Sequence, residues 1–136
     1  MKALVHFNLP EEAGLNFPFS QAVSDGNLLF VAGQVASDDP DWSGQTGDIE
    51  GETHKVMQRI GRILAAQRVG FEDVLRVGVF ITNLDDFDRM NAVYRTYFLG
   101  PNLPARTCVG VANLLGQHVI EIDCVARLRL DDTPTD

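Results

Sequence analysis

Two charged residues stand where they could handle a small carboxylic acid. Arg106, in the run 104–109, stands at the entry of an expected strand, just after a proline-containing loop. A guanidinium there can hold a carboxylate through two parallel hydrogen bonds. Glu121 lies in the apolar run 119–123, where a partly buried carboxylate can order and activate water. Ordinary alternatives remain open: a surface or acid-paired arginine, and a glutamate in an edge or interface salt bridge.

Three more residues could contact a ligand. Cys108 follows Arg106 by two positions, so a regular strand places both side chains on one face. Its thiol is either a nucleophile or an inert packing group. Asn91 interrupts the apolar face of an expected helix, as a ligand contact or a satisfied buried amide. Gly33 ends an expected strand, where its backbone can approach a ligand or simply form a bulge or turn.

Charge and composition exclude several classes of protein. The 136 residues include 11 Lys and Arg against 19 Asp and Glu, a net charge of −8, which disfavours nonspecific nucleic-acid binding. Two cysteines and three scattered histidines form no disulfide framework, redox motif or metal-ligand pair. The chain has no apolar run of the ~20 residues that span a bilayer and no signal-peptide pattern. We expect a cytoplasmic protein that contacts no membrane and needs no metal.

Periodic apolar residues predict one domain, covering 1–136, with six strands and two helices. The first helix is expected to begin at Asp48 and stop at Gly70, and the second to be capped by Asp85. The strands are expected over 3–7, 20–23, 28–33, 74–82, 107–111 and 119–128, and a flexible tail over 129–136. Together they indicate an α+β fold with one mixed six-stranded sheet and both helices on one face. The other face then needs a partner, which predicts a homo-oligomer.

The basic residues divide into two groups under this prediction. Most are expected on helix faces and strand ends, such as Lys55, Arg59, Arg62 and Arg129. Arg106 is left as the cation expected to be functional. Because the acidic exterior would not attract an anion from a distance, recognition must come from short-range contact with this guanidinium.

Six stretches, distributed over residues 17–127, resemble the reactive intermediate deaminase family (RidA, also called YjgF). The last two, Pro-Ala-Arg-Thr-Cys-Val and Val-Ile-Glu-Ile-Asp-Cys-Val-Ala, are specific in their order and separation. The matching stretches are 17–23, 29–34, 77–87, 90–94, 104–109 and 119–126.

The resemblance implies a chorismate-mutase-like homotrimer with active clefts between subunits. Its implied activity is hydrolysis of 2-aminoacrylate-type enamines and imines to 2-keto acids and ammonia, without cofactor or metal. Arg106 would clamp the substrate carboxylate and Glu121 would position the attacking water. Backbone groups of Gly33 and Cys108 would contact the ligand, and Asn91 would shape the pocket.

Three positions depart from the family pattern. Phe19 stands where a tyrosine is usual and Ala32 where a serine is usual, so the cleft loses two hydroxyls and is expected to hold fewer ordered waters. Leu115 stands where a proline often occurs. These changes predict either a preference for bulkier or more apolar imino acids or a lower deaminase rate.

Other functions remain open at this stage. The principal alternative is a regulatory trimer that holds a carboxylate through Arg106 without turnover. A specialised deaminase of a catabolic pathway is a further possibility. Family members are also described as ribonucleases or translation inhibitors, and the net charge of −8 makes this the least favoured alternative.

Overall fold

The computed structural model describes residues 3–12 and 14–129 and contains the predicted order of strands and helices. The first three strands precede α1, β4 lies between the two helices, and two strands follow α2. The strands are β1 (Val5–Phe7), β2 (Ala22–Ser24), β3 (Leu28–Gln34), β4 (Val74–Ile81), β5 (Ala105–Gly110) and β6 (Ile120–Arg127), and the helices are α1 (Ile49–Ala66) and α2 (Phe87–Tyr94). Of the predicted tail 129–136, all but Arg129 lies outside the described residues.

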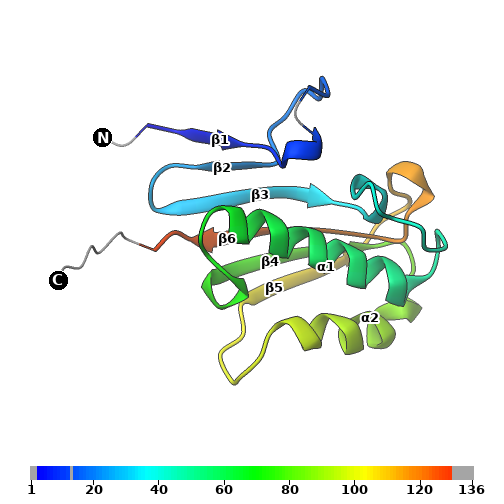
Figure 1. Cartoon of the computed structure of the whole chain (residues 1–136). Coiled ribbons are helices and arrows are strands. Elements are labelled where there is room, and N and C mark those ends of the chain that lie inside the picture. Colours follow the sequence, from blue (N-terminus) through cyan, green and yellow to red (C-terminus); the bar gives the residue numbers. More distant parts are fainter. Residues whose placement is uncertain (1–2, 13, 130–136) are drawn as a thin grey trace.

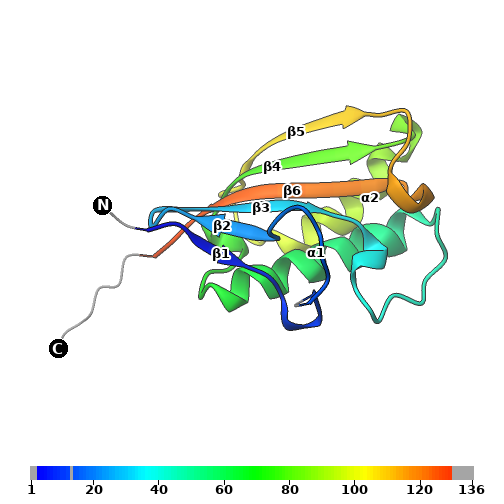
Figure 2. The same ribbon diagram turned by 90° about the horizontal axis from the view of Figure 1, so that it is seen from above.

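All six strands form one mixed sheet in the order β1-β2-β3-β6-β4-β5. The β4–β5 pair is parallel and every other pair is antiparallel. Both helices lie on the same face of the sheet, as Figures 1 and 2 show. The α+β architecture predicted from the sequence is therefore confirmed.

Alternation along the strands gives the sheet two chemically different faces. Val77, Val79 and Ile81 of β4 point toward the helices and are buried, as the period of two requires. The face away from the helices, here called the open face, carries large apolar groups that remain exposed. Phe30 of β3 and Val109 of β5 are examples, with 49% and 39% of their side chains accessible.

The helix ends differ from the prediction in detail. The first helix ends at Ala66, before Gly70, because Arg68 takes the left-handed conformation (φ 64°) that breaks the helix. Asp48 is the residue before the helix, as predicted, but its side chain makes no capping hydrogen bond. Asp86, not Asp85, precedes α2.

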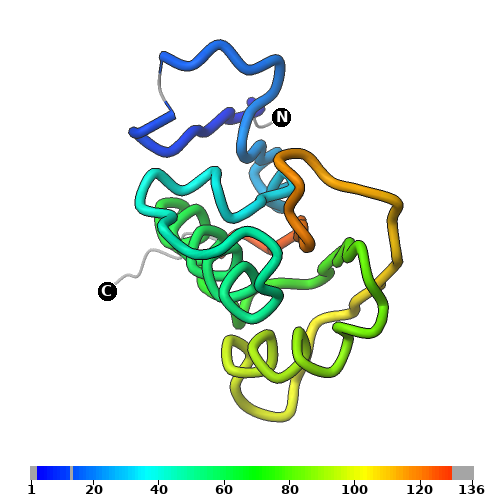
Figure 3. The backbone as a smooth tube through the Cα atoms, turned by 90° about the vertical axis from the view of Figure 1, so that its right-hand side faces the viewer, coloured from blue at the N-terminus to red at the C-terminus, as the bar shows by residue number. Residues whose placement is uncertain are grey.

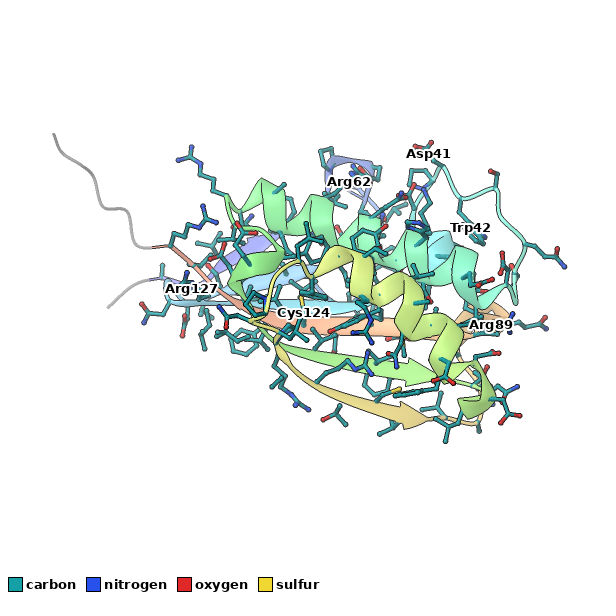
Figure 4. All side chains as sticks on the ribbon, turned by 90° about the horizontal axis from the view of Figure 1, so that it is seen from below. Asp41, Trp42, Arg62, Arg89, Cys124 and Arg127 are labelled. Atoms are coloured by element: carbon teal, nitrogen blue, oxygen red, sulfur yellow. The ribbon has the colours of Figure 1, made fainter. Side chains whose placement is uncertain are left out.

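Arg59 lies on α1 but on its buried face, unlike an ordinary solvated helix arginine. Its side chain is fully inaccessible, and its Nε donates to Oε1 of Gln34 at 2.6 Å. Its other nitrogens contact Glu11 and Glu12 of the N-terminal segment, and Arg62, labelled in Figure 4, also binds Glu11. A buried guanidinium needs such partners, so this network ties the N-terminal segment to α1 and to the end of β3.

No helix among the described residues is long and apolar enough to cross a membrane. In the same part of the chain, no group of three His, Cys, Asp or Glu side chains is arranged to hold a metal ion.

A second charged cluster fastens the end of β6. Asp73 is inaccessible to solvent and accepts hydrogen bonds from Arg127 (3.0 Å) and Arg129 (3.1 Å) and from the backbone N–H of Gly70 (3.0 Å). Burial alone would raise the pKa of this carboxyl, but the Gly70 N–H and the two arginines outweigh it, so the pKa lies below its ordinary value. Figure 4 shows Arg127 near this end of the sheet.

We predict that Asp73→Asn lowers the free energy of unfolding at pH 7 by about 1.5–3 kcal/mol, the contribution of a hydrogen bond to a charged group. A lowered carboxyl pKa stabilises the fold above the unfolded-state pKa, and this contribution is lost as the pH falls through the folded-state value. The difference from wild type, measured by urea unfolding at one protein concentration, should therefore shrink from pH 7 toward pH 3. Asp85→Asn, at an exposed position, is the matched control. An equal difference in unfolding free energy at pH 7 and pH 3 would contradict a lowered pKa of Asp73 in the folded protein.

Candidate active site

Arg106 lies on the helix-covered side of the sheet, at the β5 edge. Its partner in the β4–β5 register is Val77, whose side chain is buried under the helices. Paired residues of neighbouring strands share a face, so the guanidinium points toward α2. There it borders a cavity of about 220 Å³, here called the Arg106 cavity, whose other lining residues are Asn91, Tyr94, Arg95, Phe98, Leu103 and Pro104.

Helix α2 holds the guanidinium through one of its faces. Phe87, Asn91 and Tyr94 recur at helical spacing and therefore share that face. Nη1 of Arg106 donates to Oδ1 of Asn91 at 2.7 Å. The guanidinium carbon lies 4.7 Å from the ring centroid of Tyr94 and 5.6 Å from that of Phe87, within the range of cation–π attraction. Asn91 is thus a hydrogen-bond acceptor for Arg106. The rings of Phe87 and Tyr94 are additional site residues that the sequence analysis did not identify, although their helical spacing with Asn91 indicates a shared face.

Arg106 forms no ion pair with a carboxylate anywhere in residues 3–12 and 14–129. It is only half-buried. Arg59, Arg62, Arg127 and Arg129 are all paired with acids instead. A positive charge held beside a cavity by a neutral amide and two rings is free to bind an anion, which removes the acid-paired alternative for this residue.

Cys108 shares the face of Arg106, as predicted. It pairs with Val79 in the β4–β5 register and is half-buried against the core. Burial raises the pKa of the thiol, and the nearby Arg106 charge offsets this only in part. A thiol protonated at neutral pH is a poor nucleophile, so this arrangement favours a packing and contact role over covalent catalysis.

Glu121 lies on the opposite side of the sheet. Its partner in the β4–β6 register is Phe80, which points to the open face. The carboxylate lies against Gly33, where an added Cβ would come within 2.0 Å of Oε2, so only glycine permits this approach. Burial, and then the negative charges of Asp38 and Asp123, raise the pKa of Glu121. The group therefore has the character of a proton acceptor whose charged form is disfavoured.

The two other predicted site residues, Ala32 and Phe19, do not line the Arg106 cavity. Ala32 is half-buried, and its N–H donates to the carbonyl of Gln21 at 2.8 Å. It lines a broad hollow of about 520 Å³ on the open face. Phe19, in the loop before β2, has 56% of its side chain exposed and stacks on Phe17 with ring centroids 5.4 Å apart.

The site residues therefore form two half-sites in one chain. The Arg106 half-site contains Arg106, Asn91 and Cys108, at the β5–α2 edge. The Glu121 half-site contains Glu121, Gly33 and Ala32, on the open face. Because β-sheet side chains cannot cross the backbone layer, the two half-sites of one chain do not face each other.

The chain is similar to proteins of one known family. A family model described as "Endoribonuclease L-PSP", which covers the RidA/YjgF proteins, matches residues 12–128. A RutC family protein of Pyrococcus horikoshii is 40% identical over 119 residues, which are 88% of this chain and 91% of that protein. The 2-iminobutanoate/2-iminopropanoate deaminase of Mus musculus is 33% identical over 109 residues, or 80% of each chain.

A solved structure has the same architecture. The crystal structure of Escherichia coli TdcF with bound serine superposes with a TM-score of 0.76 at 29% sequence identity, covering 84% of this chain and 91% of that one. The order of elements seen here is thus shared with a protein that holds a small amino acid.

The Asn91–Arg106 contact predicts a measurable effect on anion binding. Asn91→Leu keeps the branched shape of the side chain but removes the acceptor, so the guanidinium loses one orienting hydrogen bond worth about 0.5–1.5 kcal/mol. Affinity for 2-oxobutanoate, measured by titration calorimetry, should fall by roughly 2- to 12-fold. Asn102→Leu, at an exposed position of the loop before β5, should bind as wild type does. An unchanged affinity in Asn91→Leu would show that this hydrogen bond does not orient the guanidinium of Arg106 for anion binding.

Proposed function

The chain belongs to the endoribonuclease L-PSP (RidA/YjgF) family, and from this premise we propose that it hydrolyses imines and enamines of small 2-amino acids to 2-keto acids and ammonia. The observation that carries the proposal is the guanidinium of Arg106, held beside a cavity without a carboxylate partner among the described residues. The deaminase relative of Mus musculus supports the reaction class, and the serine bound by the E. coli relative supports the carboxylate.

In this proposal Arg106 binds the substrate carboxylate. Asn91 takes one N–H of the guanidinium, and other N–H groups remain for two parallel hydrogen bonds to the ligand. The rings of Tyr94 and Phe87 fix the plane of the guanidinium. A carboxylate anchored this way places the adjacent imine carbon in a defined position, which lowers the entropic part of the barrier.

Glu121 is proposed to act from a second copy of the chain. One chain places Arg106 and Glu121 on opposite faces of its sheet, so a cleft that uses both must be assembled between subunits. The exposed apolar groups of the open face, such as Phe30 and Val109, support such an assembly. A homotrimer with three intersubunit clefts, as the family resemblance implies, is the arrangement we propose.

The chemical steps then use groups of this chain alone. Glu121 orients a water molecule and accepts its proton as the oxygen attacks the protonated imine carbon. The resulting carbinolamine collapses, its C–N bond breaks, and ammonia leaves after the nitrogen gains a proton. Backbone groups of Gly33 and Cys108 contact the ligand. No step requires a metal or cofactor.

Phe19 and Ala32, which depart from the family pattern, are proposed to set substrate preference. Phe19 presents an exposed ring with no hydroxyl, and Ala32 presents only a methyl group to the open face. Phe98 and Leu103, both apolar, also line the Arg106 cavity. A cleft with these walls favours imino acids with larger apolar side chains over 2-iminopropanoate.

Carboxylate binding without turnover is the second candidate. The same Arg106 geometry would serve it, and the serine in the E. coli relative is compatible with it. The two candidates separate at Glu121, which a pure binding protein does not need.

The first experiment tests activity and the shared cleft together. Arg106→Ala and Glu121→Gln should each abolish accelerated decay of 2-aminoacrylate, followed by absorbance with an enzyme that generates it. Oligomers co-expressed from both variants should regain about a quarter of wild-type activity, since random assortment restores both native residues in that share of clefts.

Three outcomes of this experiment would count against the proposal. No acceleration by wild type with any imino acid, together with measurable keto-acid binding, favours the binding protein. Loss of activity in both single variants, with no recovery when they are co-expressed, places the cleft within one chain. Ribonuclease activity that persists in Arg106→Ala after extensive purification would overturn the reaction class.

The second experiment tests substrate preference. Imines are generated in situ by an amino-acid oxidase from alanine, 2-aminobutanoate, leucine and phenylalanine. Wild type should hydrolyse the larger apolar imines faster, and the double variant Phe19→Tyr/Ala32→Ser should shift the ratio toward 2-iminopropanoate by up to about 10-fold, the effect of one neutral hydrogen bond. If wild type hydrolyses 2-iminopropanoate as fast as every larger imine, the proposed preference is wrong.

A further inference from the structure

A third polar cluster lies at the end of the sheet where β3 ends and β6 begins. It joins Ser37, in the turn after β3, to His118, just before β6, and to Glu52 in the first turn of α1. The Nε2 atom of His118 lies 2.8 Å from Oγ of Ser37, and its Nδ1 lies 3.1 Å from Oε1 of Glu52. Figure 3, viewed from this end, shows the loop before β6 beside the segment that follows β3.

Glu52 is fixed by the backbone around it. Its side chain is fully buried, its Oε2 accepts the N–H of Gly47 at 2.7 Å, and its Oε1 accepts the N–H of Val119 at 3.0 Å. These two bonds hold the carboxylate beside the imidazole of His118, which is also buried. The Nδ1–Oε1 contact has the length of an ion pair but not the angle of a hydrogen bond. Glu52 therefore acts on His118 through its charge.

The contacts favour one tautomer of the His118 imidazole. A proton on Nδ1 is favoured because the Glu52 carboxylate faces it, which leaves Nε2 as the acceptor for the hydroxyl of Ser37. Ser37 is exposed, whereas His118 and Glu52 behind it are buried. A hydroxyl that faces solvent and donates to a buried base is the arrangement of an activated serine nucleophile.

Gly116 keeps the space beside this pair open. A Cβ at this position would lie 3.3 Å from Nε2 of His118 and 3.9 Å from Oγ of Ser37. Gly116 and the next residue, Gln117, both take positive φ angles, of 68° and 60°, so the loop turns sharply away here. A side chain at this position would crowd the imidazole of His118, and glycine avoids that contact.

We propose that Ser37, His118 and Glu52 form a second reactive site, which transfers small acyl groups from activated esters to water. Oγ of Ser37 attacks the ester carbonyl while Nε2 of His118 takes its proton. The C–O bond to the leaving group then breaks, and the imidazolium returns the proton to the departing oxygen. Water, deprotonated by His118, cleaves the acyl-serine ester, which releases the acid and restores the hydroxyl. Glu52 is a positioning residue that stabilises the imidazolium.

This site is independent of the proposed imine hydrolysis. All three groups belong to one chain and therefore need no second copy, unlike a cleft that joins Arg106 to Glu121. None of the three is assigned a role in imine hydrolysis. The failure of either proposal leaves the other standing.

The test uses the intact wild-type protein and an alkyl fluorophosphonate, which replaces its fluoride with the serine oxygen. Peptide mass spectrometry should find the phosphonyl group on Ser37. Ser37→Ala should abolish this labelling while retaining wild-type imine hydrolysis and thermal midpoint. Ser43→Ala, an exposed serine in the following loop, is the matched control and should label as wild type does.

Two more variants test the base and its partner with 4-nitrophenyl acetate. His118→Gln should lower kcat by about 100-fold or more, the usual contribution of a general base. Glu52→Gln retains an oxygen for a backbone N–H and should lower kcat without changing KM, which a structural role alone would not produce. No labelling of wild type, labelling at another serine, or unchanged kcat in His118→Gln would overturn the proposal and leave the cluster as a structural latch.

Discussion

Side chains alternate across the backbone layer of a β-sheet, and the chemistry of this protein is arranged around that constraint. The β4–β5 register turns Arg106 toward α2, and the β4–β6 register turns Glu121 to the open face. The guanidinium of Arg106 and the carboxyl group of Glu121, whose pKa is raised, are therefore separated within one chain. Since the open face also leaves large apolar groups exposed, the same constraint that separates the half-sites supplies the surface for assembly.

Buried polar contacts hold each half-site in place. On the helix side, α2 presents an amide and two aromatic rings to the guanidinium. On the other side, the buried Arg59 binds the side chain of Gln34, which also donates to the carbonyl of Ala32 at 3.1 Å. This network braces the backbone on both sides of Gly33, where the Glu121 carboxylate lies. Partnered charges in the core thus position the Glu121 carboxylate, which forms no ion pair with any residue of 3–12 or 14–129.

The two proposed reactive sites differ in what the fold must supply. A cleft between subunits exists only after assembly, so its activity depends on the oligomer. The cluster of Ser37, His118 and Glu52 is complete in one chain, because the end of β3, the start of β6 and the first turn of α1 meet at one end of the sheet. Residues far apart in the sequence become neighbours there through the pairing of β3 with β6 and the packing of α1 on the sheet.

The sequence by itself determined the order of elements, the α+β class and the family, because apolar periodicity and the motifs around Arg106 and Glu121 are local signals. It also placed Arg106 and Cys108 on one face, since that follows from alternation within a single strand. Only the tertiary structure decided that Arg59 is buried, that Asn91 accepts a hydrogen bond from Arg106, and that His118 contacts Ser37 and Glu52. Each of these depends on the register between strands or on helix packing, which long-range contacts set and no local pattern records.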